Sequence, residues 1–155
     1  VFYDCVGGFG RSLTTHALGT YSLALVASPE IRRQYPDFIT ADQNIPVPFI
    51  INEPSCVFRQ IFERYLGQKS IALDHTIELW SIPTIKNLVK SDVGISYLPR
   101  FSVQAELAEG SLAEIPTELT GTTITAVCGH HKNKWLSPLM QLFLELCTDK
   151  IRSEV

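Results

Sequence analysis

The sequence has few of the features that point to nucleic-acid binding or to a membrane. Only 19% of its 155 residues are charged, and the formal net charge is −3. Binding to phosphate backbones needs clustered Lys and Arg, so we do not expect this segment itself to contact DNA. No apolar run approaches the roughly 20 residues that cross a bilayer. The hydrophobic fraction of 45% is ordinary for a globular protein and argues against a disordered chain.

The sequence also lacks closely spaced cysteines. The four cysteines are widely spaced and form no CxxC pair, which indicates neither a structural zinc site nor a disulfide scaffold. Free thiols are typical of a reducing compartment, so we expect a cytoplasmic protein. The chain begins with Val1, inside a predicted strand, rather than with Met. We therefore expect it to be an N-terminally truncated part of a longer protein.

Short β-rich apolar runs alternate with helical patterns along the chain. This alternation predicts an α/β fold with a mostly parallel sheet. Breaks at 7–17 and 117–121 bracket a block of the size of a compact lobe, which suggests one lobe inserted between pieces of another. Strands are expected at 1–5, 21–27, 49–51, 76–80, 94–99 and 122–128, and helices from Ser55 to Gly67, after Ser81, over 101–109 and from Ser137-Pro138 onward.

Two of these helices begin directly after strands, at Ser55 and at Ser81. Open α/β sheets bind ligands at the carboxyl ends of strands, where helix N-termini offer unpaired N–H groups and a partial positive charge. The two starts therefore predict a site for a small anion, above all a carboxylate, with the serine hydroxyls as further donors. The alternative interpretation is that each serine only caps its own helix.

Cys56, at the start of the first of these helices, has two interpretations. A helix N-terminus stabilises a thiolate, so Cys56 could be a nucleophile or a redox sensor if a base were close. The candidate bases are His16, His75, His130 and His131, and the sequence places none of them beside it. Because no thiol motif surrounds it, we favour a small, half-buried residue whose backbone N–H matters more than its sulfur.

Two other candidate motifs lack the context that their chemistry needs. Cys128-Gly129-His130-His131 contains metal-ligand residue types, but no further ligands are spaced to complete a site, so we favour a strand end and a polar turn. Gly7-Gly8-Phe9-Gly10 is not followed by a helix-opening pattern and does not predict a dinucleotide loop. We expect a flexible hinge at Gly7 and Gly8 instead. No catalytic residue, metal or cofactor is predicted.

Six segments follow one another in an order and spacing that are specific only when taken together. They are Leu23–Pro29, Pro54–Arg59, Glu78–Val89, Gly94–Pro99, Phe101–Leu112, and Leu136–Pro138 with the helix after it. This order resembles the effector-binding domain of LysR-type transcriptional regulators, which typically shows a strand, a helix ending in Val and a Gly-Ile-x-x-Leu-Pro strand. The resemblance covers nearly the whole chain and implies two α/β lobes joined by two crossovers, as in type 2 periplasmic binding proteins.

The resemblance also implies a division of the chain and a location for the effector. Residues 1–8 and 120–155 would form part of a first lobe, 19–117 a complete second lobe, and 9–18 and 118–119 the crossovers. In this family the effector sits between the lobes. The residues that would contact it from the second lobe are carried over by position, and they are Ser55, Cys56, Ser81 and Ile82.

The function that the resemblance implies is ligand sensing without catalysis. The partners would be a small effector, most simply a carboxylate or another small anion, and further copies in a homodimer or tetramer of the full-length protein. DNA would be bound only through an N-terminal helix-turn-helix missing from this chain, and no membrane is implied. Two alternatives stay open. One is a solute-binding protein of a transporter, which shares the architecture, and the other is a thiol-dependent enzyme that uses Cys56.

Overall fold

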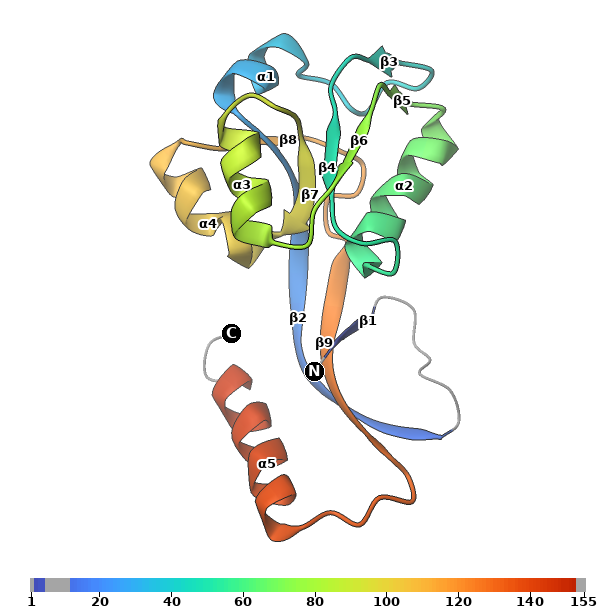
Figure 1. Ribbon diagram of the computed structural model, residues 1–155, viewed down its shortest axis with the longest axis vertical. Helices are drawn as coiled ribbons and strands as arrows, with labels where there is room; N and C mark the ends of the chain where they lie inside the picture. The colour runs from blue at the N-terminus through green and yellow to red at the C-terminus, as the bar shows by residue number, and fades with distance from the viewer. Residues whose placement is uncertain (1, 5–11, 153–155) are drawn as a thin grey trace. The chain divides into compact units, whose positions relative to one another are not determined.

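Alternating strands and helices form two units (Figure 1). The computed structural model describes residues 2–4 and 12–152. Unit 1 combines Val1–Tyr21 with Thr123–Val155, and unit 2 comprises Ser22–Thr122. Strand β2 (Leu13–Ala27) carries the chain from unit 1 into unit 2. The assignment of these units to the two lobes of the family stays a prediction.

Unit 2 contains most of the regular structure. After β2, its elements in chain order are α1 (Pro29–Gln34), β3 (Asn44–Ile45), β4 (Phe49–Ile51), α2 (Val57–Lys69), β5 (Ala72–Leu73), β6 (Thr76–Glu78), α3 (Ile82–Lys90), β7 (Ser96–Pro99), α4 (Arg100–Glu109) and β8 (Ala113–Ile115).

The central strands of unit 2 run β6, β4, β7 and β2. β4 pairs with β6 in parallel, and a parallel bridge between Phe49 and Ile95 joins β4 to the start of β7. β2 is antiparallel to both β7 and β8. The expected parallel sheet is therefore confirmed for β4, β6 and β7 and wrong for β2, which runs against them, whereas β8 pairs with β2 and runs the same way as β7. The reason is that β2 brings the chain into unit 2 while β8 leads it back, so these two strands must run in opposite directions.

Helices cover both faces of this sheet. The chain moves one way across the sheet from β4 through α2 to β6, and the other way from β6 through α3 to β7. Right-handed crossovers in opposite directions place their helices on opposite faces. On the α2 face, the Phe62 ring lies 4.8 Å from that of Phe49 and 5.1 Å from that of Tyr97. On the other face, α3 packs against β4 and β7 through the fully buried Ile85 and Val89.

Gly94 allows the close approach of β4 and β7. The N–H of Ile95 donates to the carbonyl of Pro48 at 3.0 Å, and the N–H of Ile50 donates to the carbonyl of Ile95 at 2.8 Å. A Cβ at Gly94 would lie 2.3 Å from the Pro48 carbonyl oxygen. This position of the Gly-Ile-x-x-Leu-Pro strand therefore needs glycine for space.

Unit 1 is a small antiparallel arrangement with one helix. β1 (Phe2–Asp4) pairs antiparallel with β9 (Thr123–His131), and β9 also neighbours β2. Helix α5 (Pro138–Arg152) follows the cap Ser137, whose hydroxyl oxygen accepts the N–H of Met140 at 3.3 Å. The expected Ser-Pro helix start is confirmed. Within the part of the chain that the structure describes, no helix is long and apolar enough to cross a membrane.

Several expected boundaries differ from the structure. The strand expected at 21–27 begins at Leu13, so residues 13–18 of the expected crossover are strand. The helix expected to stop at Gly67 continues to Lys69, because Ser70 takes up the left-handed cap conformation (φ 54°) that glycine usually supplies. Gly7 and Gly8, the expected hinge, lie outside the described residues.

Candidate functional site

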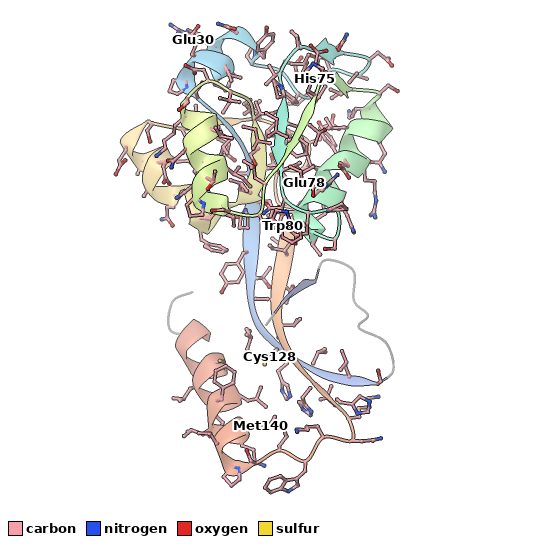
Figure 2. All side chains as sticks on the ribbon, in the orientation of Figure 1. Glu30, His75, Glu78, Trp80, Cys128 and Met140 are labelled. Atoms are coloured by element: carbon pink, nitrogen blue, oxygen red, sulfur yellow. The ribbon has the colours of Figure 1, made fainter. Side chains whose placement is uncertain are left out.

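The carboxyl ends of β4 and β6 lie side by side in unit 2. Ile51 pairs with Glu78, and the N–H of Leu79 donates to the carbonyl of Ile51 at 2.8 Å. Helices α2 and α3 begin within a few residues of these strand ends. In Figure 2, Glu78 and Trp80 lie at one end of unit 2 and His75, just before β6, lies toward the other. We call the two segments after these strands, 52–57 and 79–82, the carboxyl edge.

Ser81 caps α3 as expected. Its hydroxyl oxygen accepts the N–H of Thr84 at 3.4 Å, and its carbonyl accepts the N–H of Ile85 at 2.9 Å. Pro83 has no N–H, so it leaves no donor unpaired in this turn. The N–H of Ile82, at the first helical position, has no intrahelical acceptor. The start of α3 therefore presents one backbone donor and the Ser81 hydroxyl, whose own proton is free to donate outward.

Ser55 does not cap α2, and this expectation was wrong. The helix begins at Val57 with Cys56 at the cap position. Glu53, Pro54 and Ser55 form a turn in which the N–H of Cys56 donates to the carbonyl of Glu53 at 2.9 Å. Proline favours the second position of such a turn, and this displaces Ser55 from the cap to the exposed corner. The structure still places Ser55 at the same carboxyl edge as Ser81 and Ile82.

The Cys56 thiol is buried and does not have the depressed pKa that a helix N-terminus alone would favour. Burial raises its pKa to about 11, although the nearby backbone N–H groups of Arg59 and Phe58 oppose the rise. The thiol is therefore protonated at neutral pH and a poor nucleophile. Because the thiol forms no cap hydrogen bond, the N–H groups of Val57, Phe58 and Arg59 have no intrahelical acceptor in the first turn of α2.

Arg59 links the start of α2 by hydrogen bonds to the ends of β4 and β6, a role that sequence reasoning missed. Its Nη1 donates to the carbonyl of Asn52 at 2.9 Å and to the Glu78 carboxylate at 3.0 Å, while its Nε donates to Glu63 at 2.9 Å. Burial lowers the Arg59 pKa, but the hydrogen bonds with Glu63 and Glu78 outweigh this and leave the pKa raised. The two carboxylates more than neutralise its charge, so attraction for an anion must come from the helix N-termini.

Asn52 and Trp80 are two further residues of the carboxyl edge that sequence reasoning missed. Asn52 directly follows β4 and is only 7% exposed, and its Oδ1 has no hydrogen-bond partner. Trp80 immediately precedes the α3 cap and is 79% exposed. A polar residue directly after a buried strand was a signal for Asn52. Trp80 was hidden because the predicted strand ran to residue 80, whereas β6 ends at Glu78.

The histidines of Cys128-Gly129-His130-His131 lie in unit 1, at the end of β9. The strand reaches His131, and a turn follows in which the N–H of Lys134 donates to the His131 carbonyl at 2.8 Å. The ring of His130 stacks on that of His16 in β2, with centroids 5.5 Å apart. Among the described side chains, no three His, Cys, Asp or Glu residues are grouped so that they could hold a metal ion. The motif is thus a strand end and a turn, as favoured.

One known protein family matches nearly the whole chain. The family model described as the LysR substrate binding domain matches residues 9–152. The uncharacterized HTH-type transcriptional regulator YfiE of Escherichia coli (strain K12) is 48% identical over 145 residues, which are 94% of this chain and 48% of that protein. The RuBisCO operon transcriptional regulator of Acidithiobacillus ferrooxidans is 29% identical over 99 residues, 64% of this chain and 32% of that protein. The chain spans about half the length of YfiE and less of the other.

Solved structures agree on the fold. The regulatory domain of CcmR from Synechocystis PCC6803, solved in complex with 2-PG, aligns with a TM-score of 0.75 at 18% identity and covers 97% of this chain and 72% of its own. The apo regulatory domain of HypT from Salmonella typhimurium aligns with a TM-score of 0.76 at 14% identity and covers 94% and 68%. The expected type 2 periplasmic-binding-protein-like α/β fold is confirmed.

Proposed function

The chain belongs to the LysR substrate-binding domain family, and we propose that it senses a small anionic effector on behalf of a transcription regulator. The observation that carries this proposal is the carboxyl edge, where the starts of α2 and α3 follow two hydrogen-bonded parallel strands. Each start leaves one first-position N–H, and aligned helix dipoles favour negative charge at this end. The predicted residues Ser55, Cys56, Ser81 and Ile82 all lie there.

The wider assembly is part of the same proposal. Unit 2 serves as the second lobe, with 19–117 as its expected extent, and unit 1 as part of a first lobe built from 1–8 and 120–155. The effector binds between the lobes, and binding shifts the balance of lobe or subunit arrangements in a dimer or tetramer. YfiE is named as an HTH-type regulator and is about twice as long as the matched segment, which supports a DNA-binding part in the full-length protein and a cytoplasmic location.

The relatives' ligands support a small effector. The CcmR regulatory domain was solved in complex with 2-PG, and a HypT regulatory domain with a bromide ion. We propose no catalysis, because the candidate nucleophile Cys56 is buried and its pKa is raised to about 11. No observation favours a transporter's solute-binding protein.

Ligand-dependent melting tests this proposal. The full-length protein that carries this chain is heated with each of a panel of small carboxylates. A true effector stabilises the folded state by about 2.7 kcal/mol at 100 times its Kd. Ser81→Ala is expected to reduce this stabilisation, because it removes a donor beside the Ile82 N–H and loosens the start of α3.

Ser137→Ala is the matched control. Ser137 caps α5 in unit 1 just as Ser81 caps α3, with a helix N–H bound to the hydroxyl oxygen at 3.3 Å in one case and 3.4 Å in the other. Loss of either cap costs about 1 kcal/mol of stability. Only Ser81→Ala should change the ligand-induced shift. If the Ser81→Ala protein keeps the full ligand-induced shift in melting, the carboxyl edge is not part of the effector site.

A further inference from the structure

Trp80 is exposed at the carboxyl edge, where the proposed function places the effector. It is 79% exposed, whereas the aromatic residues of the unit 2 core, such as Phe62 and Tyr97, are buried. A tryptophan buries 150–250 Å² when it is covered, so leaving it in water forgoes a large stabilisation. Trp80 stands directly between β6 and the cap of α3. The exposed indole of Trp80 therefore lies within two residues along the chain of the proposed anion donors, the Ser81 hydroxyl and the Ile82 N–H.

Asn52 is a second unsatisfied group at the same edge. A buried carbonyl oxygen without a hydrogen bond costs about 1–3 kcal/mol. Asn52 Oδ1 has no hydrogen-bond partner, and the residue is only 7% exposed. Asn52 directly follows Ile51, whose carbonyl accepts the N–H of Leu79 at 2.8 Å, so it lies beside the segment that leads into α3.

Three complementary kinds of group consequently lie at the carboxyl edge, in the segments that follow the two paired strands. The Ile82 N–H and the Ser81 hydroxyl can donate to a carboxylate. Asn52 Oδ1 can accept a hydrogen bond, and the Trp80 indole can stack on a planar apolar group. From this juxtaposition we propose that the effector is an aromatic acid that also carries an amino or hydroxyl donor, with Trp80 as the residue that selects the ring. This inference rests on the proposed function and specifies the ligand class of the same site.

The experiment measures binding of two ligand triads to the full-length protein that carries this chain. Salicylate, benzoate and lactate form one triad, and the free amino acid phenylalanine, hydrocinnamate and free alanine form the other. Every ligand in a triad has a carboxylate. The first member also carries a ring and a hydrogen-bond donor, the second a ring alone, and the third a donor alone. We expect the first member of at least one triad to bind about 10-fold more tightly than the other two, as stacking and one hydrogen bond to a buried acceptor allow.

The variants are Trp80→Ala, Trp80→Phe and Trp135→Ala. Trp135 is 76% exposed in unit 1 and is therefore a control matched in residue type and exposure. Trp80→Ala is expected to weaken binding of the ring-plus-donor ligand about 10-fold, without changing the affinity for its ring-free counterpart. Trp80→Phe keeps a ring and should retain most of the affinity, and Trp135→Ala should retain all of it. Because both side chains are exposed, we expect these variants to fold.

The possible outcomes separate the two proposals. If lactate or alanine binds as tightly as any aromatic acid and Trp80→Ala changes nothing, the aromatic class is overturned while the proposed function stands. If benzoate or hydrocinnamate binds as tightly as its donor-bearing counterpart, the assignment of Asn52 is overturned. If Trp135→Ala weakens binding as much as Trp80→Ala, the selecting role of Trp80 is overturned. If no carboxylate of either triad or of the wider panel binds, the proposed function fails as well.

Discussion

The two units differ in how completely they bury their apolar side chains. In unit 2, Phe62 is fully buried against Phe49 and Tyr97, and helices cover both faces of the sheet. In unit 1, an apolar groove of about 600 Å³ lies between β9 and α5, and its lining includes the residues labelled Cys128 and Met140 in Figure 2. Helix α5 exposes a stripe at helical spacing, made of Leu139, Leu142, Phe143 and Leu146.

This difference shows which unit buries its apolar side chains within its own chain segment. A helix stripe with spacing of three and four residues is normally the face that packs against a core. Unit 2 has such partners for α2 and α3 within its own chain segment. In unit 1 the four residues of the α5 stripe are half exposed or more, even where Leu139 and Phe143 line the groove beside β9, which agrees with the proposal that unit 1 is only part of a lobe. Exposed apolar surface of this kind favours association with another surface.

The largest expected effect comes from two phenylalanines that represent the two units. Phe62→Ala removes a fully buried ring and leaves a cavity, so it should lower the free energy of unfolding by about 3–5 kcal/mol. Phe143 is 54% exposed, so Phe143→Ala should change it by roughly 0.5 kcal/mol or less. Urea unfolding of this chain measures both values.

Tryptophan fluorescence assigns the effects to the units, because this chain has one tryptophan in each. Trp80 lies in unit 2 and Trp135 in unit 1, so Trp135→Phe and Trp80→Phe backgrounds follow the units one at a time. Equal losses from Phe62→Ala and Phe143→Ala would break the contrast and show that the α5 stripe is covered in the protein tested. If Phe143→Ala lowers the free energy of unfolding more in the full-length protein than in this chain, residues outside this chain pack against the α5 stripe.

A smaller but still large effect is expected at Gly94 in unit 2. Gly94→Ala places a Cβ 2.3 Å from the Pro48 carbonyl oxygen, so β4 and β7 must separate and their hydrogen bonds must lengthen. Overpacking against backbone of this kind costs about 1–3 kcal/mol. Gly67→Ala is the control, because a Cβ there meets nothing within 4 Å. It should be neutral or slightly stabilising in the interior of α2, and a Gly94→Ala protein as stable as the control would refute the steric role.

The pattern of apolar residues was enough to predict most of the fold. Ser81-Ile82-Pro83 and Ser137-Pro138 begin helices as predicted, because a capping hydroxyl and an early proline act locally and need no tertiary partner. The direction of β2 was not predictable in this way, since strand pairing depends on where the chain enters and leaves unit 2. Ser70 shows the same limit, because a serine in the left-handed conformation carries no sequence signal.

The candidate site was predicted in location but only partly in its chemistry. Strand ends followed by helices placed Ser55 and Ser81 at one edge, which follows from the parallel pairing of β4 and β6. Sequence reasoning could not foresee that the turn at Pro54 would move the cap of α2 to Cys56, or that burial would raise the pKa of this thiol. Arg59 and Asn52 owe their roles to contacts and burial across the sheet, which spacing along the chain does not reveal.

The smallest expected effect sharpens the contrast between the units through pH. The ion pairs found among the described residues all lie in unit 2. In one of them, Lys86 Nζ on α3 lies 2.6 Å from Glu106 Oε1 on α4 and also donates to the Ser102 carbonyl at 2.9 Å. The hydrogen bond from Lys86 lowers the Glu106 pKa below its ordinary value of 4.5. A carboxyl group with a lowered pKa stabilises the fold above pH 4.5 and loses this contribution as the pH falls through the lowered value.

Glu106→Gln should therefore cost about 1 kcal/mol of unfolding free energy at neutral pH. The difference from the unchanged protein should shrink as the pH falls from 4.5 through the lowered pKa of Glu106, because the protonated side chain is then uncharged like that of Gln. Glu109→Gln is the control, because Glu109 is exposed on the same helix and takes part in none of the described ion pairs. The Trp80 transition of unit 2 should respond more strongly than the Trp135 transition of unit 1. A cost that stays constant across this pH range would show that the charge of Glu106 does not hold α3 against α4.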